Sequence, residues 1–154
     1  MIRTILGIDP SLKLSGWGVI TVNGKTISYV ASGNLPTNPK DRKDKKLAYI
    51  HTEFANLIQK YKPEVIAMEE TFINKNPTSS LTLAQVRGAI MAAIGTHDVI
   101  FLEFAPNHIK KTVTGAGLAD KTQVLNMIKI LLNVQELKQL DQADALAVAY
   151  TALL

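Results

Sequence analysis

Two carboxylates each follow a short apolar run that predicts a buried strand. Asp9 comes directly after residues 5–8, and Glu69 comes directly after residues 65–68. A charge at the end of a buried strand is unfavourable unless another group pairs with it, so both positions are candidates for a functional site. Local alternatives exist, because Asp9 precedes Pro10 and would suit a turn, and a glutamate at a strand end can simply face solvent.

Two further carboxylates, Asp141 and Asp144, lie three residues apart at the start of a predicted helix over 141–153. That spacing places both on one face of the helix. The rest of the helix is small and apolar, which favours close packing on a sheet. Acids at a helix N-terminus also interact favourably with the helix dipole, so this pair alone has an ordinary structural explanation. The joint placement of all four carboxylates on converging elements favours a site.

We refer to Asp9, Glu69, Asp141 and Asp144 as the four acids. Clustered carboxylates repel one another and need a counter-charge. Oxygen ligands favour Mg²⁺ or Mn²⁺, and the chain has no cysteine for a thiolate site. Two such ions can activate water and stabilise the leaving oxygen of a phosphodiester. The pattern therefore predicts metal-dependent phosphodiester hydrolysis, and it leaves open whether Glu70 joins the metal site.

The elements that must position the four acids follow from hydrophobic periodicity and turn signals. Strands are predicted at residues 3–9, 15–22, 26–33, 65–68 and 99–104, and helices at 47–61, 81–94, 108–111, after 120, and at 141–153. Strands linked by helices normally add in parallel. We therefore expect an α/β fold with a mixed five-stranded sheet, three antiparallel strands and then two parallel ones, flanked by helices. Asp9 and Glu69 then lie at the carboxyl ends of strands, where such sheets carry their sites.

Two local signals make sharper predictions. The dipeptide Asn23-Gly24 predicts a hairpin turn, because both residues tolerate positive φ. Ser79 or Ser80 is expected to cap the helix over 81–94. That helix has few strongly polar members, so we expect it to be covered on nearly all sides and to contact a second copy of the chain. Its small residues are Ala84, Gly88, Ala89, Ala92 and Ala93.

Length and composition bound the class of protein. The chain has 154 residues, which favours a single domain over residues 1–154. Its net charge of +4 suits a polyanionic partner, although charge alone decides little. The N-terminus lacks the apolar core of a signal peptide, and the purest apolar run, residues 88–95, is too short to span a bilayer. We therefore expect a cytoplasmic protein without a membrane partner.

Four motifs occur in a fixed order: LGIDP at 6–10, AMEETF at 67–72, TGAGLADKTQV at 114–124 and DQADALA at 141–147. Together they resemble the RuvC family of Holliday-junction resolvases, the crossover junction endodeoxyribonucleases, and the likeness runs from Thr4 to Tyr150. The resemblance implies a ribonuclease-H-like fold, a homodimer and a requirement for Mg²⁺, with Mn²⁺ as a substitute. It implies paired, symmetric nicks in opposed strands of a four-way DNA junction during recombination and repair. A branch-migration helicase complex is the partner implied.

The same resemblance assigns roles to individual residues. The family's metal-binding acids correspond to the four acids, its catalytic lysine to Lys121, and a DNA-contacting lysine to Lys110. The aromatic residue of its junction-opening loop corresponds to Phe72. Two positions depart from the family pattern. Ser11 replaces the usual glycine after Asp-Pro, and Glu70 replaces a commonly uncharged residue, which adds a like charge beside the catalytic glutamate.

The residues themselves give partial support to a DNA interface. Phe72 lies near Lys75 in a polar loop, and aromatic side chains stack on unpaired bases, although a loop phenylalanine more often fills a core. Lys121 follows a glycine-rich loop and lies in a capping-box pattern over 120–123, at a helix N-terminus suited to phosphate. Lys110 alone is typical of a solvated surface.

Two other functions remain open at this stage. One is another nuclease with the ribonuclease-H-like fold, since the fold alone does not decide the reaction. The Asp-x-x-Asp spacing of the last helix favours the resolvase type. The other is a catalytically silent junction-binding protein, against which the presence of all four acids speaks.

Overall fold

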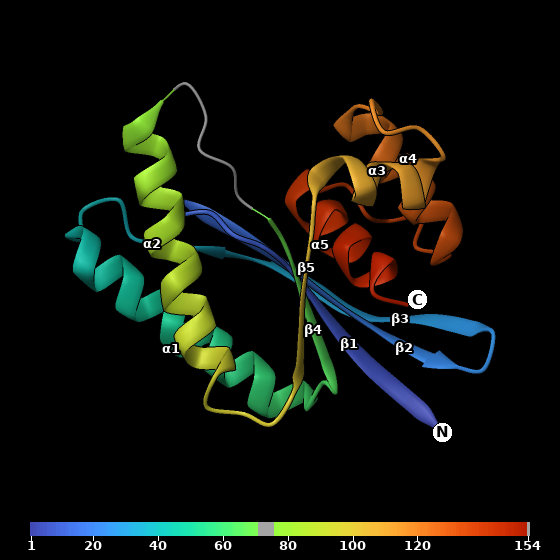
Figure 1. Cartoon of the computed structure of the whole chain (residues 1–154), viewed down its shortest axis with the longest axis horizontal. Helices are drawn as coiled ribbons and strands as arrows, with labels where there is room; N and C mark the ends of the chain where they lie inside the picture. The colour runs from blue at the N-terminus through green and yellow to red at the C-terminus, as the bar shows by residue number, and fades with distance from the viewer. Residues whose placement is uncertain (71–75, 154) are drawn as a thin grey trace.

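The structure, a computed structural model, describes residues 1–70 and 76–153 and contains a mixed five-stranded sheet (Figure 1). The strands are β1 (Ile2–Asp9), β2 (Leu14–Asn23), β3 (Thr26–Pro36), β4 (Val65–Glu69) and β5 (Ile100–Phe104). Their order in the sheet is β3-β2-β1-β4-β5. The first three strands pair antiparallel, and β4 runs parallel to both β1 and β5. The predicted mixed sheet is therefore confirmed.

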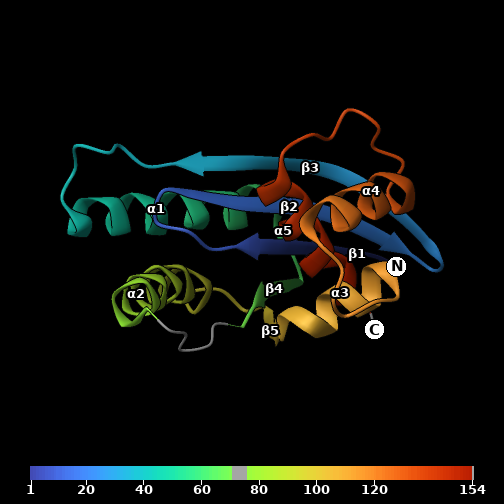
Figure 2. The same cartoon turned by 90° about the horizontal axis from the view of Figure 1, so that it is seen from above.

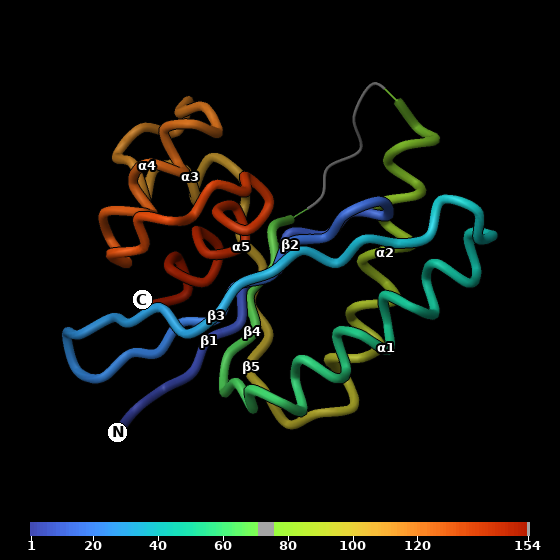
Figure 3. The backbone as a smooth tube through the Cα atoms, turned by 180° about the vertical axis from the view of Figure 1, so that it is seen from behind, coloured from blue at the N-terminus to red at the C-terminus, as the bar shows by residue number. Residues whose placement is uncertain are grey.

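Helices cover both faces of this sheet. Those in the described part of the chain are α1 (Lys43–Tyr61), α2 (Pro77–Ile94), α3 (Pro106–Thr114), α4 (Lys121–Leu131) and α5 (Leu140–Thr151). α1 and α2 lie side by side on one face, and α3, α4 and α5 lie on the other (Figures 2 and 3). Within residues 1–70 and 76–153, none of the helices combines the length and apolar character needed to cross a membrane.

Each face of the sheet has its own apolar core, because successive side chains of a strand point to opposite faces. Ile8 and Met68 are buried in the core against α1 and α2, whereas Ala67 is buried in the core against α5. Asp9 and Glu69 each follow a residue that points to the α1–α2 side. Their side chains therefore emerge on the α5 side, at the ends of two adjacent parallel strands.

α5 packs directly on β1 and β2 because glycines leave room for its backbone. A Cβ atom on Gly7 would lie 2.0 Å from the carbonyl oxygen of Ala145, and one on Gly16 would lie 2.1 Å from that of Asp141. α5 is buried along most of its length, and four of its buried residues are alanines, which keep the helix narrow: Ala143, Ala145, Ala147 and Ala149. The predicted close packing of this helix on the sheet is confirmed, and it carries the two helix acids toward the strand ends.

The hairpin between β2 and β3 forms where the sequence predicted it but with different turn residues. Asn23 pairs with Thr26, so the two-residue loop consists of Gly24 and Lys25. Of these two residues, only Gly24 has a positive φ, at 62°. A glycine at the first loop position is typical of a type II′ turn, which needs a single left-handed residue. The predicted hairpin is confirmed, with Asn23 as the last residue of β2 and not part of the turn.

α2 begins earlier than predicted, and its cap is a different residue. Asn76 is the N-cap, and its side-chain oxygen accepts a hydrogen bond from the backbone N–H of Ser79 at 3.2 Å. Pro77 then occupies the first turn, where its fixed φ suits a helix and its missing N–H costs nothing. The predicted cap at Ser79 or Ser80 is therefore wrong, since both serines lie within the helix.

β3 and α3 each continue past their predicted last residue, while the capping box is confirmed. β3 continues to Pro36, which an edge strand tolerates. α3 continues to Thr114 and ends at Gly115 in the left-handed conformation. At the start of α4, Asp120 and Gln123 each accept a hydrogen bond from the other's backbone N–H at 2.8 Å. This box fixes the first turn of α4, where Lys121 lies.

Candidate active site

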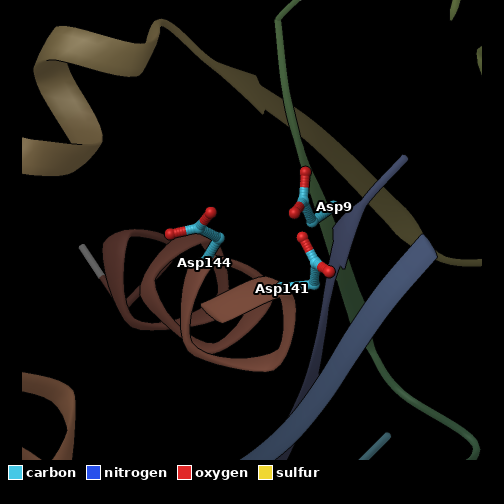
Figure 4. A group of neighbouring side chains, drawn as sticks. All are labelled: Asp9, Asp141 and Asp144. Carbon is cyan, nitrogen blue, oxygen red and sulfur yellow. The ribbon is translucent and has the colours of Figure 1, made fainter. Parts of the chain in front are cut away.

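Asp9, Asp141 and Asp144 bring their carboxylates together at the end of β1 (Figure 4). One oxygen atom from each residue lies within 4.8 Å of the other two. Asp9 is the last residue of β1, and the two other aspartates project from the start of α5. The structure thus places three of the four acids within reach of one small ion.

A cavity of about 160 Å³ is lined by Asp9 and Asp144 and adds Glu69 and two lysines. Glu69 is the last residue of β4, Lys110 comes from α3, and Lys121 is the first residue of α4. Lys121 Nζ lies 3.3 Å from Asp144 Oδ2, and the lysine side chain remains largely exposed. The cavity therefore combines carboxylates with two cations that can meet an anion from solvent.

Burial and mutual repulsion raise the pKa values of the acids in this cluster and so disfavour their ionised forms. Burial raises the pKa of Asp9 to about 8, and the negative charges of Asp144, Glu69 and Asp141 add to the increase. Burial also raises the pKa of Glu69 and that of Asp144, although Lys121 lowers both in part. In return, the charge of Asp144 raises the pKa of Lys121. The cluster holds more carboxylates than its lysines neutralise.

These properties fit a divalent cation. The donor set consists of carboxylate oxygens, the ligands that Mg²⁺ and Mn²⁺ prefer. Without an added cation, Asp9 would keep its proton at neutral pH, because its pKa is about 8. A bound divalent cation would favour the ionised form of every ligand. The four acids therefore have both the chemistry and the charge imbalance expected of a metal site.

The raised pKa of Asp9 predicts how pH affects the metal-free protein. In the unfolded chain the carboxyl ionises near its ordinary pKa of 3.8, whereas in the folded protein it keeps its proton up to about pH 8. Between these values the unfolded state binds fewer protons, so folding stability falls as pH rises, by at most about 1.4 kcal/mol per pH unit. Asp9→Asn removes the titrating carboxyl and with it this fall in folding stability. The variant should therefore melt at a higher temperature than the wild type at pH 8 without metal.

Thermal denaturation of metal-free wild type and Asp9→Asn at pH 5 and pH 8 measures this effect. We expect the variant's advantage to be larger at pH 8 than at pH 5. Addition of Mg²⁺ should raise the melting temperature of the wild type more than that of the variant. A variant that is less stable than wild type at pH 8 without metal would contradict the described electrostatics.

The contact between Gly16 and α5 predicts a second effect. A Cβ at this position would meet the backbone of Asp141 at 2.1 Å, so Gly16→Ala must displace the start of α5. A shift of about 1 Å in catalytic geometry can cost about 100-fold in rate. We expect Gly16→Ala to lose most cleavage and metal affinity. Gly117→Ala is the matched control, because its Cβ would meet Asn107 at an ordinary 3.6 Å; equal activity of both variants would contradict the prediction.

Six of the residues predicted from sequence line or adjoin this cavity: the four acids, Lys110 and Lys121. Phe72 and Lys75 lie outside the described residues, so their roles stay predictions. Of the two neighbouring glutamates, Glu69 lines the cavity. The backbone N–H of Glu70 donates to the carbonyl of Phe104 at 2.8 Å. The geometry therefore favours Glu69 as the strand-end acid of the site.

Sequence reasoning did not identify two contacts that position the elements of the site. The hydroxyl of Ser32 donates to Gln142 Oε1 at 2.7 Å and ties the start of α5 to β3 across 110 residues of sequence. Arg87, on α2, is buried and donates to the carbonyl oxygen of Glu69. An arginine inside an apolar helix is a usable signal, whereas no local pattern points to the Ser32–Gln142 contact.

The comparisons with known proteins agree on one family. The family model described as "Crossover junction endodeoxyribonuclease RuvC" matches residues 5–152. The protein of that name from Orientia tsutsugamushi (strain Ikeda) is 50% identical over 148 residues, which cover 96% of this chain and 93% of the relative. Its counterpart from Rickettsia bellii (strain RML369-C) is 47% identical over 150 residues, covering 97% and 96%.

A solved structure supports the same assignment. The structure of Thermus thermophilus RuvC in complex with Holliday junction substrate has a TM-score of 0.90 to this chain, at 26% sequence identity. The match covers 97% of this chain and 92% of that one. The predicted ribonuclease-H-like fold is thus confirmed along almost the whole chain. The chain belongs to the RuvC family of crossover junction endodeoxyribonucleases.

Proposed function

We propose that residues 1–154 form one nuclease domain that resolves four-way DNA junctions by paired, symmetric nicks in opposed strands. The observation that carries the proposal is the cluster of Asp9, Asp141 and Asp144, with oxygens within 4.8 Å of one another, beside a cavity that adds Glu69 and two lysines. Family membership supports this function, because the Thermus thermophilus relative is described in complex with Holliday junction substrate.

We propose Mg²⁺ as the cofactor, with Mn²⁺ as a substitute, held by the four acids. When bound, the ion would supply an activated water and stabilise the leaving oxygen of the phosphodiester. The chain's own residues shape the surroundings. Val124, Ala147 and Val148 give the cavity apolar walls, which limit bulk water and strengthen electrostatic contacts inside.

Lys110 and Lys121 are the proposed phosphate contacts at this cavity. Both line it, and they come from α3 and α4, which flank one side of the site. Lys121 already pairs with Asp144, so its ammonium is held next to the reacting position. A fixed cation there would stabilise charge that develops on the scissile phosphate. Phe72 and Lys75, which precede α2 in the sequence, are proposed to contact the junction.

Lys121→Ala tests the role of that cation in the reaction. The variant loses a charge at the cavity, so we expect turnover to fall about ten-fold or more, with little change in junction affinity. Single-turnover cleavage and junction binding in chelator give the two quantities. Lys129→Ala, at the other end of α4, is the matched control. Equal losses of junction affinity and turnover would show that Lys121 only binds the DNA phosphate backbone and does not act in the reaction.

A homodimer is proposed because two opposed nicks need two sites related by a two-fold axis. The candidate interface is the outer face of α2, which the described part of this chain leaves exposed. Leu81 is 60% exposed and Met91 is 41% exposed, and Ala84, Gly88 and Ala92 lie exposed on the same helix. These small and apolar residues would let a second helix approach closely.

The remaining parts of the proposal rest on family resemblance and chemistry. A branch-migration helicase complex is the proposed protein partner. The cytoplasm is the proposed location, because a junction resolvase must reach chromosomal DNA. The net charge of +4 suits a polyanionic substrate and adds a salt-dependent contribution to its binding.

The proposed function is tested by incubating the protein with a labelled four-way junction and with a linear duplex of the same arm sequence. Each substrate is offered with Mg²⁺ and with chelator. We expect cleavage of the junction alone, only with metal, at symmetric positions in opposed strands. Equal cleavage of the duplex would favour another ribonuclease-H-like nuclease. Binding without cleavage would indicate a silent junction-binding protein, and either result would contradict the proposal.

A further inference from the structure

Arg87 reaches the backbone of Glu69 from the side of the sheet opposite the cavity. Arg87 belongs to α2, and its side chain is 10% exposed. Nη1 donates a hydrogen bond to the carbonyl oxygen of Glu69, and Nη2 donates to Oε2 of Glu103 on β5. Figure 1 shows α2 on one side of β4 and α5 on the other. The guanidinium therefore contacts the backbone of Glu69 from the α2 face of the sheet, while the cavity lies on the α5 face.

The peptide group between Glu69 and Glu70 is held at both of its polar atoms. Its carbonyl oxygen accepts from Arg87, and its N–H donates to the carbonyl of Phe104 at 2.8 Å. This peptide group is also where β4 ends. Beyond this peptide group, the hydrogen bonds of the sheet no longer fix the backbone. These two hydrogen bonds therefore set the orientation of the peptide group at the end of β4.

Core packing alone does not account for an arginine at this position. Burying a charge is costly, and a buried ion pair is often replaceable by apolar residues without loss of stability. Val86 and Ile90, near it on α2, are fully buried in the apolar core, so an apolar residue would fit the pattern of this helix. What an apolar residue cannot supply is a pair of donors directed at the ends of β4 and β5.

We infer that Arg87 is a positioning residue that fixes the peptide group after Glu69 and so aims the Glu69 carboxylate into the cavity. The inference rests on the proposed function, in which Glu69 is a metal ligand. Glu103 supports this role, because its carboxylate neutralises the charge of the Arg87 guanidinium and orients the plane of that group. Lysine is a poor replacement, since one ammonium lacks the planar pair of donors that faces both acceptors.

Arg87→Met and Glu103→Gln separate positioning from stability. Arg87→Met keeps an unbranched, flexible side chain, although a shorter one, and removes the contact with Glu69. Glu103→Gln keeps an acceptor for Arg87 and leaves that contact in place. Binding of Mn²⁺ to DNA-free protein is measured by electron paramagnetic resonance, and the Mg²⁺ concentration for half-maximal junction cleavage is measured separately. Melting temperature and junction affinity in chelator are recorded for each variant.

We expect Arg87→Met to bind Mn²⁺ about 10- to 100-fold more weakly, the loss typical of residues that orient a metal ligand. Its Mg²⁺ requirement should rise in parallel, with junction affinity unchanged. Glu103→Gln should stay close to wild type in Mn²⁺ affinity, even where its melting temperature falls. The double variant Arg87→Met/Glu103→Leu removes the unpaired acid, so it should regain stability but remain weak in metal binding. If Arg87→Met does not fold, the double variant carries the test.

Two outcomes would overturn the inference. One is Mn²⁺ affinity that tracks melting temperature across all the variants, which would make the pair structural. The other is a double variant that binds Mn²⁺ as tightly as wild type. Wild-type protein that binds no Mn²⁺, or that cuts no junction, would instead contradict the proposed function. The two failures are therefore distinguishable in one experiment.

Discussion

The Asp144→Asn variant is expected to lose junction cleavage by on the order of a thousand-fold or more, the scale seen when a member of a catalytic unit is removed. Asparagine keeps the shape of the side chain but removes one negative charge from the cluster with Asp9 and Asp141. Junction binding should be almost unchanged, because affinity comes mainly from basic surface and counterion release. Cleavage in Mg²⁺ and binding in chelator measure the two effects.

The other three acids should behave in the same way, and Glu70 supplies the control. Asp9→Asn, Glu69→Gln and Asp141→Asn are each expected to abolish cleavage and spare binding. Glu70→Gln should retain activity, since Glu69 is the glutamate that lines the cavity. Normal cleavage by Glu69→Gln, together with loss in Glu70→Gln, would show that the strand-end ligand is assigned to the wrong residue.

The second large effect is expected from Ala92→Glu on the outer face of α2. Ala92 is exposed and lies beside Met91, which is 41% exposed. A carboxylate there costs the isolated chain little but cannot be buried unpaired between two helices. We expect a folded monomer that still binds DNA but makes single rather than paired nicks. The reason is that a monomer no longer brings a second active site to the opposed strand of the same junction.

Sedimentation and analysis of the nicked products check this expectation. Asn56→Glu is the matched control, because Asn56 is exposed on the neighbouring helix α1. This substitution adds the same charge outside the proposed interface. The control should remain dimeric and make paired nicks. Wild-type protein that sediments as a monomer at micromolar concentration and still cuts in pairs would contradict the proposed interface.

The features predictable from sequence are those that local patterns encode. The apolar runs before Asp9 and Glu69 predicted two central strands, and the three-residue spacing of Asp141 and Asp144 predicted a shared helix face. Because parallel strands end at the same edge of a sheet, the convergence of these acids followed from strand order. The capping box before Lys121 was equally local, and the structure contains both of its hydrogen bonds.

The features that escaped prediction depend on local competition or on distant contacts. Ser79 and Ser80 looked like caps, but Asn76 followed by Pro77 forms a better helix start. The helix over 81–94 was predicted to be covered on nearly all sides, in part by a second copy of the chain. The described chain alone leaves Leu81 60% exposed, so the cover of this face by a second copy stays a prediction. The bond from Arg87 to Glu69 joins two elements whose relative placement no local pattern supplies.

The central claim is that the four acids form a metal-dependent centre that resolves four-way junctions. A supercoiled plasmid that extrudes a cruciform tests it most directly, because paired nicks at the cruciform give linear DNA and unpaired nicks give open circles. We predict that wild-type protein with Mg²⁺ yields linear DNA cut at the cruciform, and that Asp144→Asn yields neither product. Linear DNA from Asp144→Asn, or from wild type in chelator, would contradict the claim.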